Sequence, residues 1–283
     1  MITNSIHFKK TRIAPTPSGF LHLGNALSFL ITAALAKKTG ACLLLRIDDL
    51  DRERMEKAYV KDIFDTLRFL QLSWDEGPRD FQEYENHYSQ LHRLDIYQGA
   101  LRQLKEGGHL FACTCSRAQI LRDNPDGIYP GTCRNKGLPF DTKDASWRLK
   151  TDAAKRLPVK TIEGKTITAT LPAQMQDFVV RKKDGFPAYQ LTSLMDDMHF
   201  GIDLIVRGED LWPSTLAQLY LAGLSQQQAF LESTFLHHPL LTGPDGDKLS
   251  KSAGDTSIQY LRSHGSTAQQ IIDLLHLHYS RYV

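Results

Sequence analysis

The apolar residues of the first fifty positions fall into two short runs on either side of one long helical pattern. The run around Ile13 is of the β type and meets Pro15, whose fixed φ and missing N–H end a strand. Residues 26–38 are densely apolar and lead to Gly40, which predicts a well-buried helix with a glycine stop. Residues 42–47 form an apolar run typical of a buried parallel strand. Strand, helix and strand in this order predict the beginning of a nucleotide-binding α/β sheet.

The apolar periodicity continues to the end of the chain with one interruption. Helices are expected at 58–70, 88–106, 211–224, 256–264 and 267–279, and strands at 204–206 and 235–240. Residues 109–187 break this pattern with short β-like pieces, turns and basic residues. We therefore expect an α/β fold with three parts: a Rossmann-like catalytic domain with a parallel sheet (1–108 and 188–254), an inserted α+β subdomain (109–187) and a short C-terminal helical extension (255–283).

Composition and charge narrow the class of protein only a little. The formal net charge of the 283 residues is +2, which leaves a nucleic-acid partner open because local charge matters more than the total. No apolar run approaches the length of a membrane span, and the first residues lack the apolar core of a secretion signal. We expect a cytoplasmic protein with no membrane partner, whose four cysteines do not form a disulfide framework.

The turn between the first strand and the first helix is suited to binding a phosphate. His22, Gly24 and Asn25 stand where the helix begins. A helix N-terminus offers unpaired N–H groups and a partial positive charge. Asn25 is expected to cap this helix, and Gly24 allows a ligand to approach the backbone. The alternative is an ordinary helix start with an exposed histidine.

Two lysines in a downstream loop are a second candidate for phosphate binding. Lys248 and Lys251 lie three residues apart in the sequence KLSKS, between glycines. Lysines on a Gly-rich loop are suited to closing over a polyphosphate. The alternative is a solvated loop.

Polar side chains crowd the carboxyl ends of two predicted strands. In an open α/β sheet, ligands bind at this edge. The first group is Asp48, Asp49 and Asp51, which either contact a substrate or cap the following helix. The second group is Arg207, Glu209 and Asp210, of which Asp210 is an alternative cap for the next helix.

Three cysteines in the inserted region predict a metal site that lacks one ligand. Cys113, Cys115 and Cys133 supply three thiols, whereas tetrahedral zinc takes four ligands. The candidates for the fourth ligand are Tyr129, His109, Asp123 and Asp126. The alternative is a group of reduced thiols in a small subdomain. Cys42, inside a predicted strand, is expected to be a core residue.

Five sequence blocks resemble one enzyme family in their order along nearly the whole chain. HLGN and KLSKS are similar to the two motifs of class I aminoacyl-tRNA synthetases. The longer block RIAPTPSGFLHLGN, together with RIDDLD, WDEGP and IVRGEDL, resembles the glutamyl branch of that class. Each block is weak alone, and their joint occurrence is a strong signal.

The resemblance implies that glutamate and ATP, with Mg²⁺, react to form glutamyl-adenylate. A carboxylate is already ionised at neutral pH, so its attack on the α-phosphate needs no general base. The implied catalytic residues are His22, Asn25, Lys248 and Lys251. The implied ATP contacts are Pro15, Gly24, Gly208, Glu209 and Asp210. The implied glutamate contacts are Arg12, Thr16, Asp48, Tyr189 and Arg207, and the alternative for the two arginines is a surface ion pair.

One position departs from the family pattern. Asp48 stands where the RIED motif of the family has a glutamate, whose carboxylate meets the α-ammonium group of the substrate. An aspartate keeps the charge but is one methylene shorter, so the amino-acid preference, and not the activation chemistry, is in question.

Two further features resemble the short paralogous family of glutamyl-queuosine tRNA(Asp) synthetases. Tyr129 stands four residues before Cys133, as in the structural zinc site of that family. The chain ends 31 residues after Ser252, with no room for an anticodon-binding region. The resemblance implies a monomer that activates glutamate without tRNA and transfers it to queuosine of tRNA(Asp). The alternatives are a catalytic fragment of a glutamyl-tRNA synthetase, a related ligase with another acceptor, and a non-enzymatic binding module.

Overall fold

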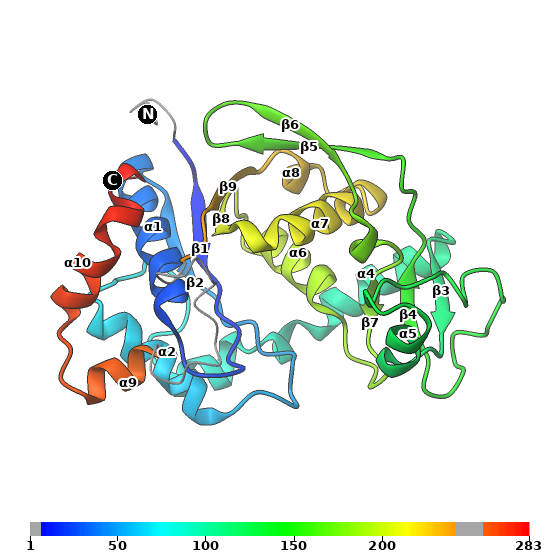
Figure 1. The fold of residues 1–283 in the computed structure, drawn as a ribbon, viewed down its shortest axis with the longest axis horizontal. Coiled ribbons are helices and arrows are strands. Elements are labelled where there is room, and N and C mark those ends of the chain that lie inside the picture. Colours follow the sequence, from blue (N-terminus) through cyan, green and yellow to red (C-terminus); the bar gives the residue numbers. More distant parts are fainter. Residues whose placement is uncertain (1–6, 242–256, 283) are drawn as a thin grey trace. The chain divides into compact units, whose positions relative to one another are not determined.

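The computed structural model describes residues 7–241 and 257–282. The chain divides into two compact units (Figure 1). The first unit contains Met1–His92, Gly201–Asp210 and Thr234–Val283, and the second contains Arg93–Phe200 and Leu211–Ser233. Both units are therefore discontinuous in sequence. The functional boundaries of an insertion, expected at 109 and 187, remain a prediction.

The first unit is built on four parallel strands, as the sequence predicts. They are β1 (Lys10–Ile13), β2 (Cys42–Leu45), β8 (Leu204–Gly208) and β9 (Thr234–His238), and they lie in the order β2-β1-β8-β9. Three of the four strands bury almost all of their residues, which explains their near-continuous apolar sequences. The two strands expected at 42–47 and 235–240 each end two residues early.

Four helices of the first unit were predicted by the apolar periodicity. They are α1 (Leu23–Thr39), α2 (Lys57–Phe69), α9 (Ile258–Ser263) and α10 (Ala268–Tyr279). Helix α1 is apolar on most of its surface because it lies between the sheet and α10 (Figure 1). It ends at Gly40, whose φ of 73° is the left-handed conformation that glycine adopts without strain.

The long helix expected at 88–106 is wrong in its first part. Helix α4 covers only Leu94–Glu106, and Leu91, expected on its apolar face, is exposed. The preceding residues form the short helix α3 (Phe81–Glu83) and then π-helical and 3₁₀ turns. The cause is Asp49, whose carboxylate accepts hydrogen bonds from the Tyr84 hydroxyl, the Ser89 hydroxyl and the Gln90 N–H at 2.6–2.8 Å. These contacts from a distant loop outweigh the local helical pattern.

The second unit combines helices with antiparallel strands. Strands β3 (Leu110–Cys113), β4 (Ser146–Leu149) and β7 (Val179–Arg181) form one sheet, and β5 (Arg156–Thr161) pairs with β6 (Thr166–Thr170). The helices, besides α4, are α5 (Arg117–Asp123), α6 (Tyr189–His199), α7 (Trp212–Leu224) and α8 (Gln228–Leu231).

Helix α6 was not predicted, because polar residues interrupt its apolar pattern. Asp196 and Asp197 are both fully buried. The Asp196 carboxylate accepts hydrogen bonds from the Arg93 guanidinium at 2.7 and 2.9 Å and from the Tyr97 hydroxyl at 2.6 Å. A buried carboxylate with this many donors fixes one packing arrangement of α4 against α6.

Within residues 7–241 and 257–282, none of the helices has the length and apolar character that crossing a bilayer requires.

Gly77 offers a test of how closely the loop after α2 packs on the sheet. Its φ is +100°, and a Cβ at this position would lie 2.1 Å from the carbonyl oxygen of Leu45 in β2. We expect Gly77→Ala to lower the free energy of unfolding by more than about 3 kcal/mol, because backbone conformation and a buried strand must both shift. Urea unfolding followed by circular dichroism measures this loss.

Gly265→Ala is the matched control for that measurement. Gly265 also has a positive φ, of +87°, but a Cβ there would meet no atom within 4 Å. We expect Gly265→Ala to lower the free energy of unfolding by only about 1–2 kcal/mol, because an alanine must then adopt the left-handed conformation. Equal losses in the two variants would contradict a close approach at Gly77.

Candidate functional site

The turn before α1 is organised by His22, which caps the helix in place of Asn25. The His22 Nδ1 accepts the N–H of Gly24 at 3.1 Å, and the Asn25 side-chain oxygen accepts the N–H of His22 at 3.0 Å. The prediction that Asn25 is the cap was therefore wrong, since Asn25 occupies the third helical position of a reciprocal capping box. Because Nδ1 is an acceptor, a neutral His22 carries its proton on Nε2, which is suited to donating to an anion.

Gly24 leaves room at this turn for the His22 ring, whereas from the sequence we expected it to leave room for a ligand. A Cβ on Gly24 would lie 3.0 Å from the Cε1 atom of His22. The space beside the backbone is thus filled by the imidazole itself. The missing side chain lets the His22 ring lie beside the first turn of α1, where Nδ1 accepts the Gly24 N–H.

None of the three aspartates after β2 caps a helix in the described part of the chain. Helix α2 begins after Glu56, so the capping alternative for the three aspartates was wrong. The Asp48 carboxylate instead accepts hydrogen bonds from the guanidinium of Arg46 at 2.6 and 3.0 Å, and both side chains are buried. Its N–H donates to the carbonyl of Pro15 at 2.9 Å. The structure thus brings Asp48 and Pro15 together at the carboxyl ends of β1 and β2.

Arg12 and Arg207 lie inside the first unit, so the surface ion pair proposed as an alternative was wrong. Arg12 is 5% exposed and Arg207 is 3% exposed. The Arg12 Nη1 donates to the carbonyl of Val206, the residue before Arg207, at 3.3 Å. Two buried guanidinium groups thus lie on neighbouring parallel strands of the first unit.

Sequence reasoning missed His237 at the same end of the sheet. His237 in β9 is in register with Arg207 in β8. Burial lowers the pKa of the His237 imidazole to about 3, and the charge of Arg207 contributes to the same shift. His237 is therefore neutral near pH 7 and adds no positive charge to this region. The sequence did offer one signal for His237: it follows the apolar residues Phe235 and Leu236 near the end of a strand, where site residues gather.

The residues after β8 form a tight 3₁₀ turn, Glu209–Leu211. Helix α7 has Leu211 at its N-cap, so the expectation that Asp210 caps it was wrong. A Cβ on Gly208 would come within 2.6 Å of the Asp210 carboxylate, which is exposed and could move aside. Both acidic side chains of the turn are exposed at the carboxyl end of the parallel sheet.

Four predicted site residues are not joined to these groups by any contact that can be described. Thr16 is exposed in the turn after β1. Tyr189 begins α6 in the second unit and is 39% exposed. Lys248 and Lys251 lie outside the described residues.

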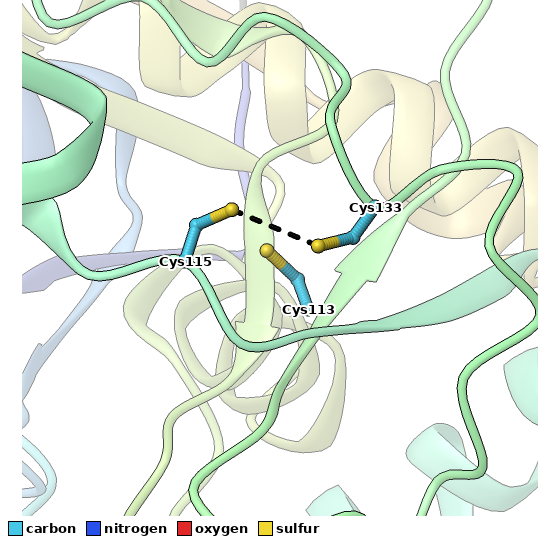
Figure 2. A group of neighbouring side chains, drawn as sticks. All are labelled: Cys113, Cys115 and Cys133. Atoms are coloured by element: carbon cyan, nitrogen blue, oxygen red, sulfur yellow. Dashed lines mark hydrogen bonds between the residues drawn. The ribbon is translucent and has the colours of Figure 1, made fainter. Parts of the chain in front are cut away.

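The three cysteines of the second unit point toward one another, as Figure 2 shows. Their sulfur atoms all lie within 4.8 Å of one another, and the sulfurs of Cys115 and Cys133 are 3.6 Å apart. Tetrahedral zinc with Zn–S bonds of about 2.3 Å separates its sulfur ligands by about 3.7 Å. The spacing and the thiol donors therefore fit zinc. Apolar neighbours shield the cluster, including Phe111, Ile120 and Leu138.

Tyr129 has its hydroxyl in this cluster. The hydroxyl accepts the N–H of Cys133 at 2.8 Å and lies 3.5 Å from the sulfur of Cys113. His109, Asp123 and Asp126 place no ligand atom in the group formed by the three sulfurs, among the residues with described positions. Of the four candidates for the remaining ligand, the geometry favours Tyr129.

The thiols differ in how readily they ionise. Burial opposes ionisation of Cys133, but hydrogen bonds from the Thr114 backbone and the neighbouring thiols outweigh it and lower the pKa of Cys133 to about 7. Burial and Glu76, by contrast, raise the pKa of Cys42 to about 11. Cys42 is half-buried at the start of β2 and donates to the Glu76 carboxylate at 3.4 Å, so its expected place in the core was wrong.

Comparisons with known proteins show the family of this chain. Residues 9–280 match the family model of tRNA synthetases class I (E and Q), catalytic domain. A glutamyl-Q tRNA(Asp) synthetase of Symbiobacterium thermophilum is 36% identical over 274 residues, which cover 92% of this chain and 83% of that protein. A glutamate–tRNA ligase of Syntrophus aciditrophicus is 32% identical over 284 residues, which cover 95% of this chain and 57% of that protein.

A solved structure shares the fold. The crystal structure of the glutamate-tRNA synthetase from Elizabethkingia anophelis matches with a TM-score of 0.73 and 23% identity, covering 94% of this chain and 61% of that chain. This chain thus spans about three fifths of the two longer proteins. The match of the family model to almost the whole chain is decisive: the chain belongs to the class I tRNA synthetases (E and Q), through their catalytic domain, and is a ligase.

Proposed function

We propose that this protein activates glutamate with ATP and transfers the glutamyl group to queuosine in tRNA(Asp). The observation that carries the proposal is the pair of buried arginines, Arg12 and Arg207, at the carboxyl ends of β1 and β8. A buried pair of guanidinium groups selects an acidic substrate, because each binds a carboxylate with two parallel hydrogen bonds. The identity of 36% to a glutamyl-Q tRNA(Asp) synthetase supports the acceptor.

The first step is attack of an α-carboxylate oxygen of glutamate on the α-phosphorus of ATP. The bond to the bridging oxygen breaks, and pyrophosphate leaves with its negative charge. His22 and the positive end of the α1 dipole stabilise the phosphates, and Asn25 holds the His22 backbone in place. Mg²⁺ neutralises phosphate charge when it is bound with ATP. Lys248 and Lys251 are proposed to assist from outside the described residues.

The remaining contacts follow from the positions of the polar groups at the same sheet edge. We assign ATP contacts to Pro15, Gly24, Gly208, Glu209 and Asp210. Asp48 is proposed to bind the α-ammonium group of glutamate, and its pairing with Arg46 fixes its carboxylate for that contact. Thr16 is proposed as a further glutamate contact, and the role of Tyr189, which belongs to the second unit, stays a prediction from the family resemblance. In the second step, a queuosine hydroxyl attacks the acyl carbon and AMP leaves.

A charge difference between the units supports a nucleic-acid partner. The segments of the second unit contain 17 Lys and Arg against 13 Asp and Glu, a formal charge of +4. The rest of the chain carries −2, which gives the total of +2. Phosphate contacts by basic side chains supply most of the affinity of proteins for nucleic acids. The second unit is thus the better candidate for contact with the tRNA.

A structural zinc ion is the second part of the proposal. Cys113, Cys115, Cys133 and Tyr129 would hold it in a closed tetrahedral set with no open position. The guanidinium of Arg148 lies 3.8 Å from the centre of the Tyr129 ring, and this buried cation offsets the negative charge of an all-anionic ligand set.

Pyrophosphate exchange into ATP tests the activation step. We expect exchange with glutamate and without tRNA, and little with aspartate or glutamine. Acylation of queuosine-containing tRNA(Asp), compared with unmodified tRNA(Asp) and tRNA(Glu), then tests the acceptor. Exchange that requires tRNA, or acylation of a tRNA 3′ end, would support a charging enzyme like the glutamate–tRNA ligases. No exchange with any amino acid would favour the non-enzymatic module.

Asp48→Glu tests the proposed contact with the α-ammonium group. The longer side chain moves the carboxylate by one methylene, so we expect the KM for glutamate to change by at least about threefold while the KM for ATP stays within about twofold. Steady-state pyrophosphate exchange measures both constants.

Asp51→Glu is the matched control. Asp51 belongs to the same sequence block, but its carboxylate is partly exposed and 3.7 Å from Arg54. We expect Asp51→Glu to leave the KM for glutamate and the KM for ATP unchanged. A glutamate KM that is the same in the Asp48 variant and in wild type would remove Asp48 from the binding site.

Elemental analysis tests the metal site. We expect about one zinc per chain in the purified protein, loss of zinc in Cys133→Ser, and weaker zinc retention against a chelator in Tyr129→Phe. Cys42→Ser is the control and should retain zinc, since Cys42 lies in the other unit. Wild-type protein without zinc, after expression in zinc-supplemented medium, would contradict the proposal.

A further inference from the structure

The turn that carries His22 is held from outside by two other elements of the first unit. The N–H of Leu21, the preceding residue, donates to the Asp62 carboxylate of α2 at 3.3 Å. The carbonyl of Leu21 accepts the N–H of Ile258, the first residue of α9, at 2.7 Å. His22 also forms an antiparallel bridge with Ser257. Both backbone polar groups before the helix cap are therefore bound by distant segments.

Burying the carboxylate of Asp62 at this position costs free energy. Its side chain is 3% exposed, and its Oδ1 atom makes no hydrogen bond within the part of the chain that is described. The nearest cation is Arg262 of α9, whose Nη2 lies 3.5 Å from Oδ1. Burial raises the pKa of Asp62, which means that the surroundings disfavour its charge. Apolar packing therefore does not account for Asp62, whose carboxylate needs polar partners to offset the cost of its burial.

What Asp62 supplies is an acceptor for the Leu21 N–H. Leu21 is 3% exposed, so this N–H has no access to water. A buried N–H without a partner costs about 1–3 kcal/mol, and the turn would shift to avoid that cost. A shift of the turn would displace His22 and the N-terminus of α1 together.

We propose that Asp62 is a positioning residue for ATP, which fixes the Leu21–His22 turn against the phosphates. Arg262 holds the Asp62 carboxylate from the side of α9. This inference rests on the proposed function only in taking the ligand of the turn to be ATP. It adds a residue on α2, about forty positions downstream, to the determinants of ATP binding.

The experiment measures the affinity for a non-hydrolysable ATP analogue with Mg²⁺ by calorimetry, in the absence of amino acid and tRNA. Asp62→Leu keeps the side-chain size but removes the acceptor, so we expect at least about fivefold weaker binding. Asp62→Asn retains a side-chain oxygen for the Leu21 N–H and should restore the affinity to within about twofold of wild type. Rescue by asparagine separates the hydrogen bond from the charge.

Asp65→Leu is the matched control. Asp65 lies on the same helix, and its carboxylate is 3.9 Å from the same Arg262 atom, but its side chain is 54% exposed. Its replacement should leave the affinity unchanged. If Asp62→Leu fails to fold, Arg262→Met provides the second test, with an expected loss of about two- to threefold.

Wild-type affinity in Asp62→Leu, or in Arg262→Met where the first variant does not fold, would overturn the proposal. A loss in Asp62→Leu that asparagine does not restore would also overturn it, because the acceptor would then not be the cause. Wild-type protein that binds the analogue but exchanges no pyrophosphate would refute the proposed function while leaving the role of Asp62 testable by binding alone.

Discussion

The parallel pairing of β1 with β2 on one side and β8 on the other is the constraint on which the candidate site depends. It brings the carboxyl ends of three strands to one sheet edge, although their residues are far apart in sequence. Arg12 and Arg207 are both buried on neighbouring strands in this way, and Asp48 meets Pro15 through a backbone hydrogen bond just beyond the strands. The relative positions of the two arginines are therefore set by the register of the sheet.

The polar groups at this edge are costly to bury. Buried arginines and carboxylates lose their hydration, and an ion pair such as Arg46 with Asp48 offsets that loss less well than apolar packing would. Under the proposed function, the same groups would give a rigid arrangement of charge that need not reorganise when a charged substrate binds. Helix α1 shows the division of tasks, since its sides are apolar and packed while its N-terminus carries the polar capping box.

The sequence predicted those parts of the structure that depend on local pattern. Strands with continuous apolar runs and the helix that stops at Gly40 were recognised, because burial on all sides leaves a plain signature. The segment before α4 failed, because the Asp49 carboxylate draws three donors from it across the fold. Helix α6 was missed for a related reason: its buried aspartates are satisfied by partners on α4 that no local window contains.

In the candidate sites too, local pattern predicted some features, and others depended on distant partners. Cysteine spacing was enough to foresee the thiol cluster, and the family resemblance already pointed to Tyr129. The positions of the Cys133 N–H and the Cys113 sulfur then favoured Tyr129 over the other candidates on geometry. The sequence did not predict the contacts of Arg46 and Asp62, because folding supplies their partners, and His237 offered only the weak signal of its place near a strand end. In all three cases a titratable side chain is removed from water beside an element of the predicted site. Supporting residues of this kind have no motif of their own, and they become visible only when the partner of every buried polar atom is accounted for.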